Sequence, residues 1–467
     1  MNARTLHADY LVIGGGAAAM AFTDALLSET DDRVVMVDRR HAPGGHWNDA
    51  YPFVHLHQPS RYYGVNSMPL GNEVLQTSGP EAGMYERASA AQICGYYQRV
   101  LSERFLPSDR VRYFPQCEYV GDGTFVSRLT GRRYDVEVRK KRVDATHLSP
   151  SIPVESGPRF EVDSGVSCIP LNDLARVTDS PDDGYVIIGG GKTAIDACLW
   201  LLDNGVDPAA ICWIKPREAW LFNRTYFQPG ELVGRFLLGL GLQMEAAANA
   251  RTTDDLFRRL EDAAQLRRVD RGVWPTMHKA ATISDRELEQ LRRIDNVVRL
   301  GHVRRLERRR IVLDHGSIPT GPGRLHVYCT ADGLRRRPPM PVFDEDRITL
   351  QTIRPGLIPF NAALIGFVEA RGGESRDKNR LCPPNPLPDT AADWMRMTLV
   401  GMNAEHAWTA EPDIAEWLDR SRLNTSAGLR RRLDDPEVAR ARELFTANVR
   451  RGLERLAALA RVASGGA

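Results

Sequence analysis

Two stretches of the chain share one pattern of hydrophobic and polar positions. In each stretch a short apolar run precedes three glycines, and a longer segment of good helix formers follows them. The apolar runs span residues 10–13 and 185–188. Uninterrupted apolar runs are typical of parallel strands that are buried on both faces. The pattern therefore predicts two units, each with the order strand, glycine turn and helix.

The first unit has the residue spacing of a dinucleotide site. Gly14, Gly16 and Ala19 form a G-x-G-x-x-A pattern, and the next apolar run ends in Asp38. The first glycine permits a tight turn, and the second lets the backbone approach a pyrophosphate at the helix N-terminus. The distance along the chain from Gly14 to Asp38 is close to that of an acid that binds ribose hydroxyls. These features together favour a dinucleotide site over an ordinary tight turn.

The second unit repeats the glycine pattern. Gly189, Gly191 and Ala194 fill the same positions, and Lys192 and Thr193 follow the last glycine. A nucleoside triphosphatase P-loop would also need a glycine five positions before Gly191, where the chain has valine. The sequence therefore predicts a second dinucleotide site rather than a P-loop.

Basic residues follow the second strand of this unit. The position that corresponds to Asp38 of the first unit is Trp213, and Lys215, Arg217 and Arg224 come next. An acid there would repel a 2′-phosphate, whereas basic side chains accept one. We therefore predict NADPH over NADH at this site. The alternative is that Lys215 and Arg217 only solvate the end of a strand.

The remaining segments predict the fold class and the domains. Residues 112–150 alternate polar and apolar positions, as in a β-meander, and residues 437–463 form an amphipathic helical pattern. We expect an α/β protein with two Rossmann-like dinucleotide-binding domains, one inserted into the other, and a helical C-terminal extension. The predicted parts are residues 1–179 and 329–400 for the first domain, 180–328 for the inserted domain, and 401–467 for the extension.

A further motif links the first unit to a known family. Gly44, Gly45 and Trp47 follow the strand that ends in Asp38, and at this point the chain resembles the flavin-containing monooxygenase superfamily. The resemblance implies that a GG-x-W element lies against FAD, so that the first site binds FAD and the second NADPH. The disulfide reductases share this plan. The residues expected to bind the cofactors are Gly14, Gly16, Ala19, Asp38, Arg39, Gly45, Trp47 and Tyr63 for FAD, and Gly189, Gly191, Lys192, Thr193, Lys215, Arg217 and Arg224 for NADPH.

The resemblance also assigns a role to the apolar segment 357–370. We expect it to form a helix capped near Asn361, whose N-terminus points at the flavin ring and stabilises the anion of reduced flavin. The chain departs from the family between its two glycine turns. The F-x-G-x-x-x-H fingerprint of Baeyer–Villiger and many N-oxidising members is absent, since only Phe160 is present. The subgroup therefore stays unassigned.

Candidate catalytic residues lie in residues 51–71, directly after Trp47. Gln58 and Asn66 are candidates to hydrogen-bond a flavin C4a-hydroperoxide, and His57 is a candidate acid or base; ordinary loop packing is the alternative for all three. Four histidines occur between residues 41 and 57, but they are spread over a predicted loop, and we expect no metal site.

We expect a single-component FAD- and NADPH-dependent monooxygenase that uses dioxygen to oxidise a small organic substrate. The first alternative is an NADPH-dependent reductase or oxidase without oxygen insertion. Two further alternatives are a flavin-dependent halogenase, for which Lys279 is the candidate lysine, and a nucleotide-binding regulator without turnover.

Composition narrows the partners and the location. The net charge of +2 gives no reason to expect nucleic acid, and no apolar stretch predicts a membrane span. The seven cysteines contain no C-x-x-C pair, which favours reduced thiols in a cytoplasmic protein. The C-terminal helix is a candidate surface for a homodimer.

Overall fold

The first sheet carries the first glycine turn. The structure, a computed structural model, describes residues 4–79, 81–150, 157–330, 333–334 and 336–465. The strand order is β3-β2-β1-β6-β5-β4, with β19 also paired to β6. Strands β1, β2, β3, β6 and β19 run parallel, whereas β4, β5 and β6 form the predicted antiparallel meander. The bounds are β1 Arg4–Ile13, β2 Val34–Val37, β3 Val111–Phe114, β4 Cys117–Gly121, β5 Thr124–Ser127, β6 Arg133–Asp144 and β19 Arg347–Thr349.

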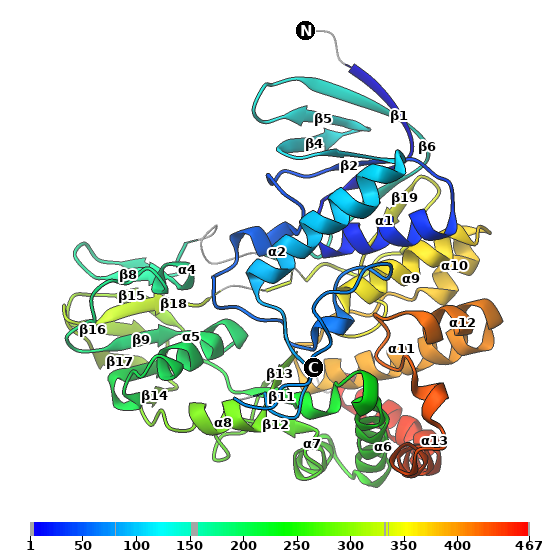
Figure 1. Cartoon of the computed structure of the whole chain (residues 1–467). Coiled ribbons are helices and arrows are strands. Elements are labelled where there is room, and N and C mark those ends of the chain that lie inside the picture. The colour runs from blue at the N-terminus through cyan, green and yellow to red at the C-terminus, as the bar shows by residue number, and fades with distance from the viewer. Residues whose placement is uncertain (1–3, 80, 151–156, 331–332, 335, 466–467) are drawn as a thin grey trace.

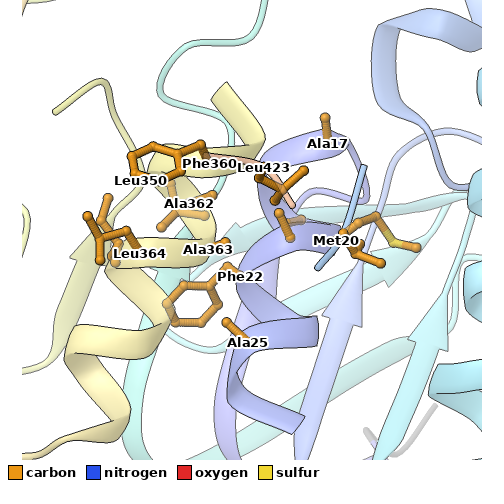
Figure 2. Packing of buried hydrophobic residues seen from close by; sticks show 14 of the residues in the cluster. Ala17, Met20, Phe22, Ala25, Leu350, Phe360, Ala362, Ala363, Leu364 and Leu423 are labelled. Carbon is orange, nitrogen blue, oxygen red and sulfur yellow. The ribbon is translucent and has the colours of Figure 1, made fainter. Parts of the chain in front are cut away.

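Two apolar helices pack against each other beneath this sheet. Helix α1 spans Ala17–Glu29 and helix α9 spans Ile358–Ala370. A Cβ built on Gly366 would lie 2.9 Å from the Cβ of Ala25, so the helices approach closely where α9 has no side chain. Figure 2 shows Phe22 of α1 beside Ala363 of α9, between the two helices. This contact joins the first glycine turn to a helix that is distant in the sequence.

The second sheet carries the second glycine turn and is entirely parallel, in the order β14-β10-β9-β18-β8. Helix α5, Lys192–Asp203, follows β9 directly. Figure 1 shows this sheet to one side of the first. Its strands are β8 Cys168–Pro170, β9 Tyr185–Ile188, β10 Ile211–Ile214, β14 Val297–Val298 and β18 Leu325–Tyr328.

Two small sheets accompany the second domain, in the orders β12-β11-β13 and β17-β16-β15-β7. Their strands are β7 Glu161–Val162, β11 Ala219–Asn223, β12 Leu266–Arg267, β13 Met277–Ile283, β15 Val303–Leu306, β16 Arg310–Leu313 and β17 Gly316–Pro319. The remaining helices are α2 Ala90–Arg99, α4 Leu171–Leu174, α6 Val233–Asn249, α7 Thr253–Asp262, α8 Asp285–Leu291, α10 Ser375–Leu381, α11 Ala391–Ala410, α12 Pro412–Arg420 and α13 Pro436–Gly465.

The strand pairing moves two predicted domain boundaries. Strand β8 pairs with β18 and strand β7 with β15, so residues 161–170 belong to sheets of the second domain and not to residues 1–179 of the first. The predicted boundary at residues 400 and 401 falls inside α11. Strands β7 and β8 are too short to give a recognisable pattern in the sequence. Helix α11 is continuous across the predicted boundary, and no turn signal marks where its residues leave the first domain.

The C-terminal helix α13 packs along α6 of the second domain (Figure 1). A Cβ on Gly452 would lie 2.7 Å from the carbonyl oxygen of Met244, and one on Gly241 would lie 3.1 Å from the side chain of Leu444. Glycines on both helices therefore permit close contact. Among the helices of the described ranges, none combines the length and apolarity that crossing a bilayer requires.

Candidate functional site

The first glycine turn is covered by the segment after β2. The amide of Gly44 donates a hydrogen bond to the carbonyl of Gly15 at 2.8 Å. A Cβ built on Gly45 would lie 2.9 Å from the Cα of Gly16. Gly14, Gly44 and Gly45 all have positive φ, of 111°, 116° and 58°. Backbone without side chains is required for so close an approach, and the approach forms a cradle of backbone groups.

Asp38 lies against the same turn, at the end of β2. Its carboxylate accepts hydrogen bonds from the amides of Gly15 and Arg40, the second at 2.7 Å. The residue is 4% exposed, and burial raises the pKa of its carboxyl group although these hydrogen bonds lower it. A carboxylate has acceptor positions beyond these two, so Asp38 fits the predicted role of binding ribose hydroxyls.

Helix α1 presents its N-terminus to this cradle. Gly16 is the N-cap residue, no side chain caps the helix, and its first turn contains no acidic residue. The free amides and the helix dipole favour an anion at this point. Ala19 is fully buried in the core with β1, as close packing of helix and sheet requires. The chemistry of this donor set fits the pyrophosphate of FAD.

Trp47 and Tyr63 lie together near the covered turn. The indole Nε1 donates a hydrogen bond to the Tyr63 hydroxyl at 2.6 Å, and the rings meet edge to face with centroids 5.9 Å apart. Burial raises the pKa of Tyr63, so its hydroxyl stays protonated. Arg39, also predicted to bind FAD, is exposed beside Asp38.

The second glycine turn has the same uncapped helix, but no described residue approaches Gly191 as Gly45 approaches Gly16. Gly191 is the N-cap of α5, without a side-chain cap or an acid in the first turn. Apart from its neighbours in the chain, no heavy atom of the described residues would lie within 4 Å of a Cβ on Gly191. Gly189 has φ 145° and lies against the carbonyl oxygen of Cys329, and Thr193 is half-buried. The donors fit a second dinucleotide, and the open space fits one that binds and leaves.

Lys192 at this turn is held by a carboxylate of its own helix. Its ammonium group forms an ion pair with Asp196, and both side chains are 12% exposed. The Tyr51 hydroxyl donates to the other oxygen of Asp196 at 2.6 Å. Phe53 stacks on Trp200 of α5 with ring centroids 4.8 Å apart. The segment that continues from the covered turn therefore packs on the helix of the open turn.

The structure contradicts two of the three residues predicted to bind a 2′-phosphate. Lys215 is 1% exposed and paired with Glu218, and Arg224 is fully buried. A buried and paired cation has no free edge for a phosphate. Arg217 remains a candidate, although its Nη1 is 3.1 Å from Asp389. Sequence shows where basic residues stand along the chain but not which of them are buried.

Arg224 instead forms a buried ionic cluster between the two domains. Its guanidinium contacts Glu81, and at 2.8 Å Glu287. Arg87 lies 2.8 Å from Glu81 and 3.2 Å from Glu287. Burial would raise the pKa of Glu287, but the two guanidinium groups hold it well below its usual range. The Nε of Arg224 also donates to the carbonyl of His57 at 3.0 Å, which ties the catalytic candidate segment to the second domain.

Asn361 lies inside α9 and does not cap it, so that prediction is corrected. Leu357 is the N-cap residue, with no side-chain cap. The Asn361 side chain accepts a hydrogen bond from the amide of Arg354 at 2.8 Å and donates to its carbonyl at 2.9 Å. It therefore shapes the loop before α9. Gln58 reaches the same loop, because its Nε2 donates to the carbonyl of Gly356 at 3.0 Å.

The other two catalytic candidates are held in different places. The His57 carbonyl also accepts from the hydroxyl of Thr282 at 2.6 Å, and burial, reinforced by nearby Lys192, lowers the pKa of its imidazole to about 3. The ring is therefore neutral at pH 7. The Asn66 amide oxygen accepts from Ser421 at 2.8 Å, which links it to the C-terminal extension. Within the described ranges, no group of three or more histidine, cysteine or acidic side chains is placed to hold a metal ion.

Sequence reasoning missed several residues that organise this region. One signal was available, because Lys192 and Asp196 stand one helical turn apart, a spacing that predicts an ion pair. The other residues come from segments far apart in sequence and meet only in the folded chain. They are Tyr51, Glu81, Arg87 and Glu287.

A cavity of about 580 Å³ lies at the opposite end of the second sheet. It is lined by residues 180–185 before and at the start of β9 and by residues 204–207 after α5. Open parallel sheets bind ligands beyond the carboxyl ends of their strands. This cavity is therefore separate from the candidate site.

Comparison with known proteins identifies relatives of this chain. No family model matches it. It is 48% identical over 428 residues to the uncharacterized protein Rv2000 of Mycobacterium tuberculosis, a match that covers 91% of this chain and 79% of that protein. The uncharacterized protein Mb2023 of Mycobacterium bovis matches to the same extent. The chain belongs to the family of these mycobacterial proteins.

Solved structures with the same fold are flavin monooxygenases. A steroid monooxygenase bound to NADP superposes with a TM-score of 0.51 at 13% identity, over 96% of this chain and 98% of that one. A polycyclic ketone monooxygenase from the fungus Thermothelomyces thermophila gives 0.51 at 12% identity, over 97% and 90%. The chain therefore has the flavin monooxygenase fold, with two Rossmann-like domains, as predicted.

Proposed function

We propose that this protein is an FAD- and NADPH-dependent monooxygenase that oxidises a small organic substrate with dioxygen. The observation that carries the proposal is the contrast between two glycine turns joined by residues 44–63. The covered turn suits a cofactor that stays, and the open turn suits one that exchanges. The NADP-bound steroid monooxygenase of the same fold supports this assignment of the cofactors.

Bound FAD would supply the chemistry, by accepting hydride from NADPH and activating dioxygen. The residues of the chain would bind and orient it. Asp38 would hold ribose hydroxyls, the amides at the start of α1 would hold the pyrophosphate, and Trp47 with Tyr63 would wall the site against water. Gly45 would keep the covering segment in backbone contact with the turn.

The loop before α9 would serve the reacting end of the cofactor. Gln58 donates a hydrogen bond to the carbonyl of Gly356 in this loop, and the N-terminus of α9, which has no side-chain cap, follows the loop. Free helix amides and the helix dipole would stabilise negative charge there. Neutral His57 would accept or donate a hydrogen bond rather than act as a cation at pH 7.

Anaerobic reduction followed by rapid mixing with oxygen tests the proposal. We expect the purified protein to contain FAD, NADPH to bleach its absorbance, and oxygenated buffer to produce a species distinct from reduced and oxidised flavin. A screen of amines, thioethers and ketones would then identify substrates that accelerate its decay. Direct return to oxidised flavin with stoichiometric hydrogen peroxide, with every substrate tested, would favour a reductase or oxidase instead. Failure of NADPH to reduce the flavin would refute the assignment of the second turn.

A further inference from the structure

One carboxylate is shared by the two cofactor regions. Asp196 receives the ammonium group of Lys192 on one oxygen and the hydroxyl of Tyr51 on the other, the latter at 2.6 Å. Lys192 is the first residue of α5, beside the open turn. Tyr51 belongs to the segment that continues from the covered turn. Asp196 thus connects Lys192, a charged residue at the second turn, to Tyr51, a residue of the segment that continues from the first turn.

The other acids nearby are already paired. Glu81 and Glu287 are bound by Arg87 and Arg224, so they do not compete for Lys192. An anion placed at the uncapped end of α5 would therefore compete with Asp196 for the Lys192 ammonium group. Phosphoryl oxygens form strong charge-assisted hydrogen bonds with such a group.

We propose that Asp196 is a positioning residue that couples the two sites: the pyrophosphate of an incoming dinucleotide draws Lys192 away from Asp196, and the released carboxylate binds Tyr51 more tightly. This inference rests on the proposed function. Dinucleotide binding would then hold residues 51–57 more firmly on α5, where Phe53 already stacks on Trp200.

The transfer of Lys192 from Asp196 to the pyrophosphate predicts the direction of two changes, one in dinucleotide affinity and one in the protection of residues 51–57. Lys192 must give up an ion pair before it can bind phosphate, so removal of the Asp196 charge should tighten dinucleotide binding. A purely structural Asp196, which only presents Lys192 to the ligand, would have the opposite effect when it is removed. Linkage also requires that loss of the Tyr51 hydrogen bond change dinucleotide affinity and abolish the added protection of residues 51–57.

Calorimetry and hydrogen exchange with NADP⁺, on the FAD-loaded protein, test the coupling. NADP⁺ is used because it binds without reducing the flavin. In the wild type we expect NADP⁺ to slow exchange of the amides of Val54 and Leu56, which donate to the carbonyls of Tyr51 and Ala88. We expect Asp196→Asn to bind NADP⁺ about fivefold or more tightly and to lose this added protection. Lys192→Met should bind roughly tenfold more weakly.

Two further variants complete the experiment. Asp203→Asn makes the same substitution at the exposed far end of α5 and should leave affinity and exchange unchanged. Tyr51→Phe keeps the Lys192 ion pair and should lose the added protection, so it tests the coupling even if Asp196→Asn fails to fold. Weaker NADP⁺ binding by Asp196→Asn, or added protection that survives in Tyr51→Phe, would overturn the inference. Absence of NADP⁺ binding to the wild type would instead refute the proposed function of the second site.

Discussion

The two glycine turns have the same sequence pattern and the same uncapped helix, yet one is covered and the other is open. At the first turn, Gly45 lies in backbone contact with Gly16, and Gly44 is hydrogen-bonded to Gly15. At the second turn no heavy atom of the described residues lies near the Cβ position of Gly191. The difference therefore comes from the segment after each unit and not from the turn itself.

This contrast suits a cofactor that is retained at the first turn and one that exchanges at the second. Under the proposed function, a ligand seated in the first turn would lie beside residues 44–47, whereas no described residue approaches Gly191 in the same way at the second turn. We expect the first arrangement to give the slower dissociation, because affinities of related sites mostly differ in their dissociation rates. A motif shared by two sites can therefore serve a resident and a visiting cofactor in one chain.

The largest expected effect is on stability and comes from weakening the ionic cluster that joins the two domains. Arg224→Met leaves Glu81 and Glu287 with one fewer guanidinium in a buried cluster, and removal of one partner from such a pair costs about 3 to 5 kcal/mol. We expect a marked fall in the free energy of unfolding, measured by urea denaturation. Arg305→Met is the control, because its ion pairs with Glu161 and Asp163 are exposed to solvent and should contribute little to stability. Equal losses in the two variants would show that the cluster does not hold the regions together.

Substitution of a glycine at one turn should weaken binding at that turn and leave the other turn unaffected. In Gly45→Ala the new Cβ would meet the Cα of Gly16 at 2.9 Å, at a residue with φ 58°. Such strain costs about 1 to 3 kcal/mol, so we expect FAD to bind roughly tenfold or more weakly, measured by titration of the apoprotein with FAD. Gly83→Ala, at φ 81° with open space around it, controls for the backbone conformation.

Gly191→Ala is the matched change at the open turn. It should retain FAD fully, because its Cβ has free space, while NADP⁺ binding weakens where the backbone must approach the pyrophosphate. The flavin content and the calorimetric affinity of the same preparation give both values. Loss of FAD from this variant would contradict the assignment of separate sites.

The smallest expected effect is on the pH dependence of stability, through a buried titratable group in each of the two domains. Burial raises the pKa of Asp38 at the first turn, so a fall in pH relieves an unfavourable charge there. His278 of β13 is fully buried, and burial lowers its pKa to about 3. The unfolded chain protonates this histidine near pH 6.5 and the folded chain resists, so stability contributed by neutral His278 is lost as pH falls from about 6.5 towards 3.

The variant His278→Phe removes that contribution. Its stability should fall less steeply between pH 6.5 and 4.5 than that of the wild type, with a difference of at most about 1.4 kcal/mol per pH unit. Melting temperatures across this range measure the slope. Identical slopes for His278→Phe and the wild type would show that this histidine is not held neutral.

Local order along the chain was readable from sequence, and contacts across the chain were not. The two strand–turn–helix units, Asp38 at the end of its strand and the meander follow from patterns within short continuous stretches. Arg224 was misassigned because its partner Glu81 lies far before it in the chain and its partner Glu287 lies on another helix. Asn361 was misassigned because the helix already begins at Ile358, where the adjoining proline favours the first turn.

The packing of α13 along α6 has a consequence for biosynthesis. Helix α6 ends at Asn249, but its partner begins only at Pro436, so the ribosome must add the intervening chain before the two can meet. At typical elongation rates this takes roughly 10 to 40 s. During that interval the nascent second domain lacks the helix that covers α6, so the face of α6 around Leu237 and Gly241 stays without its partner until the last helix emerges.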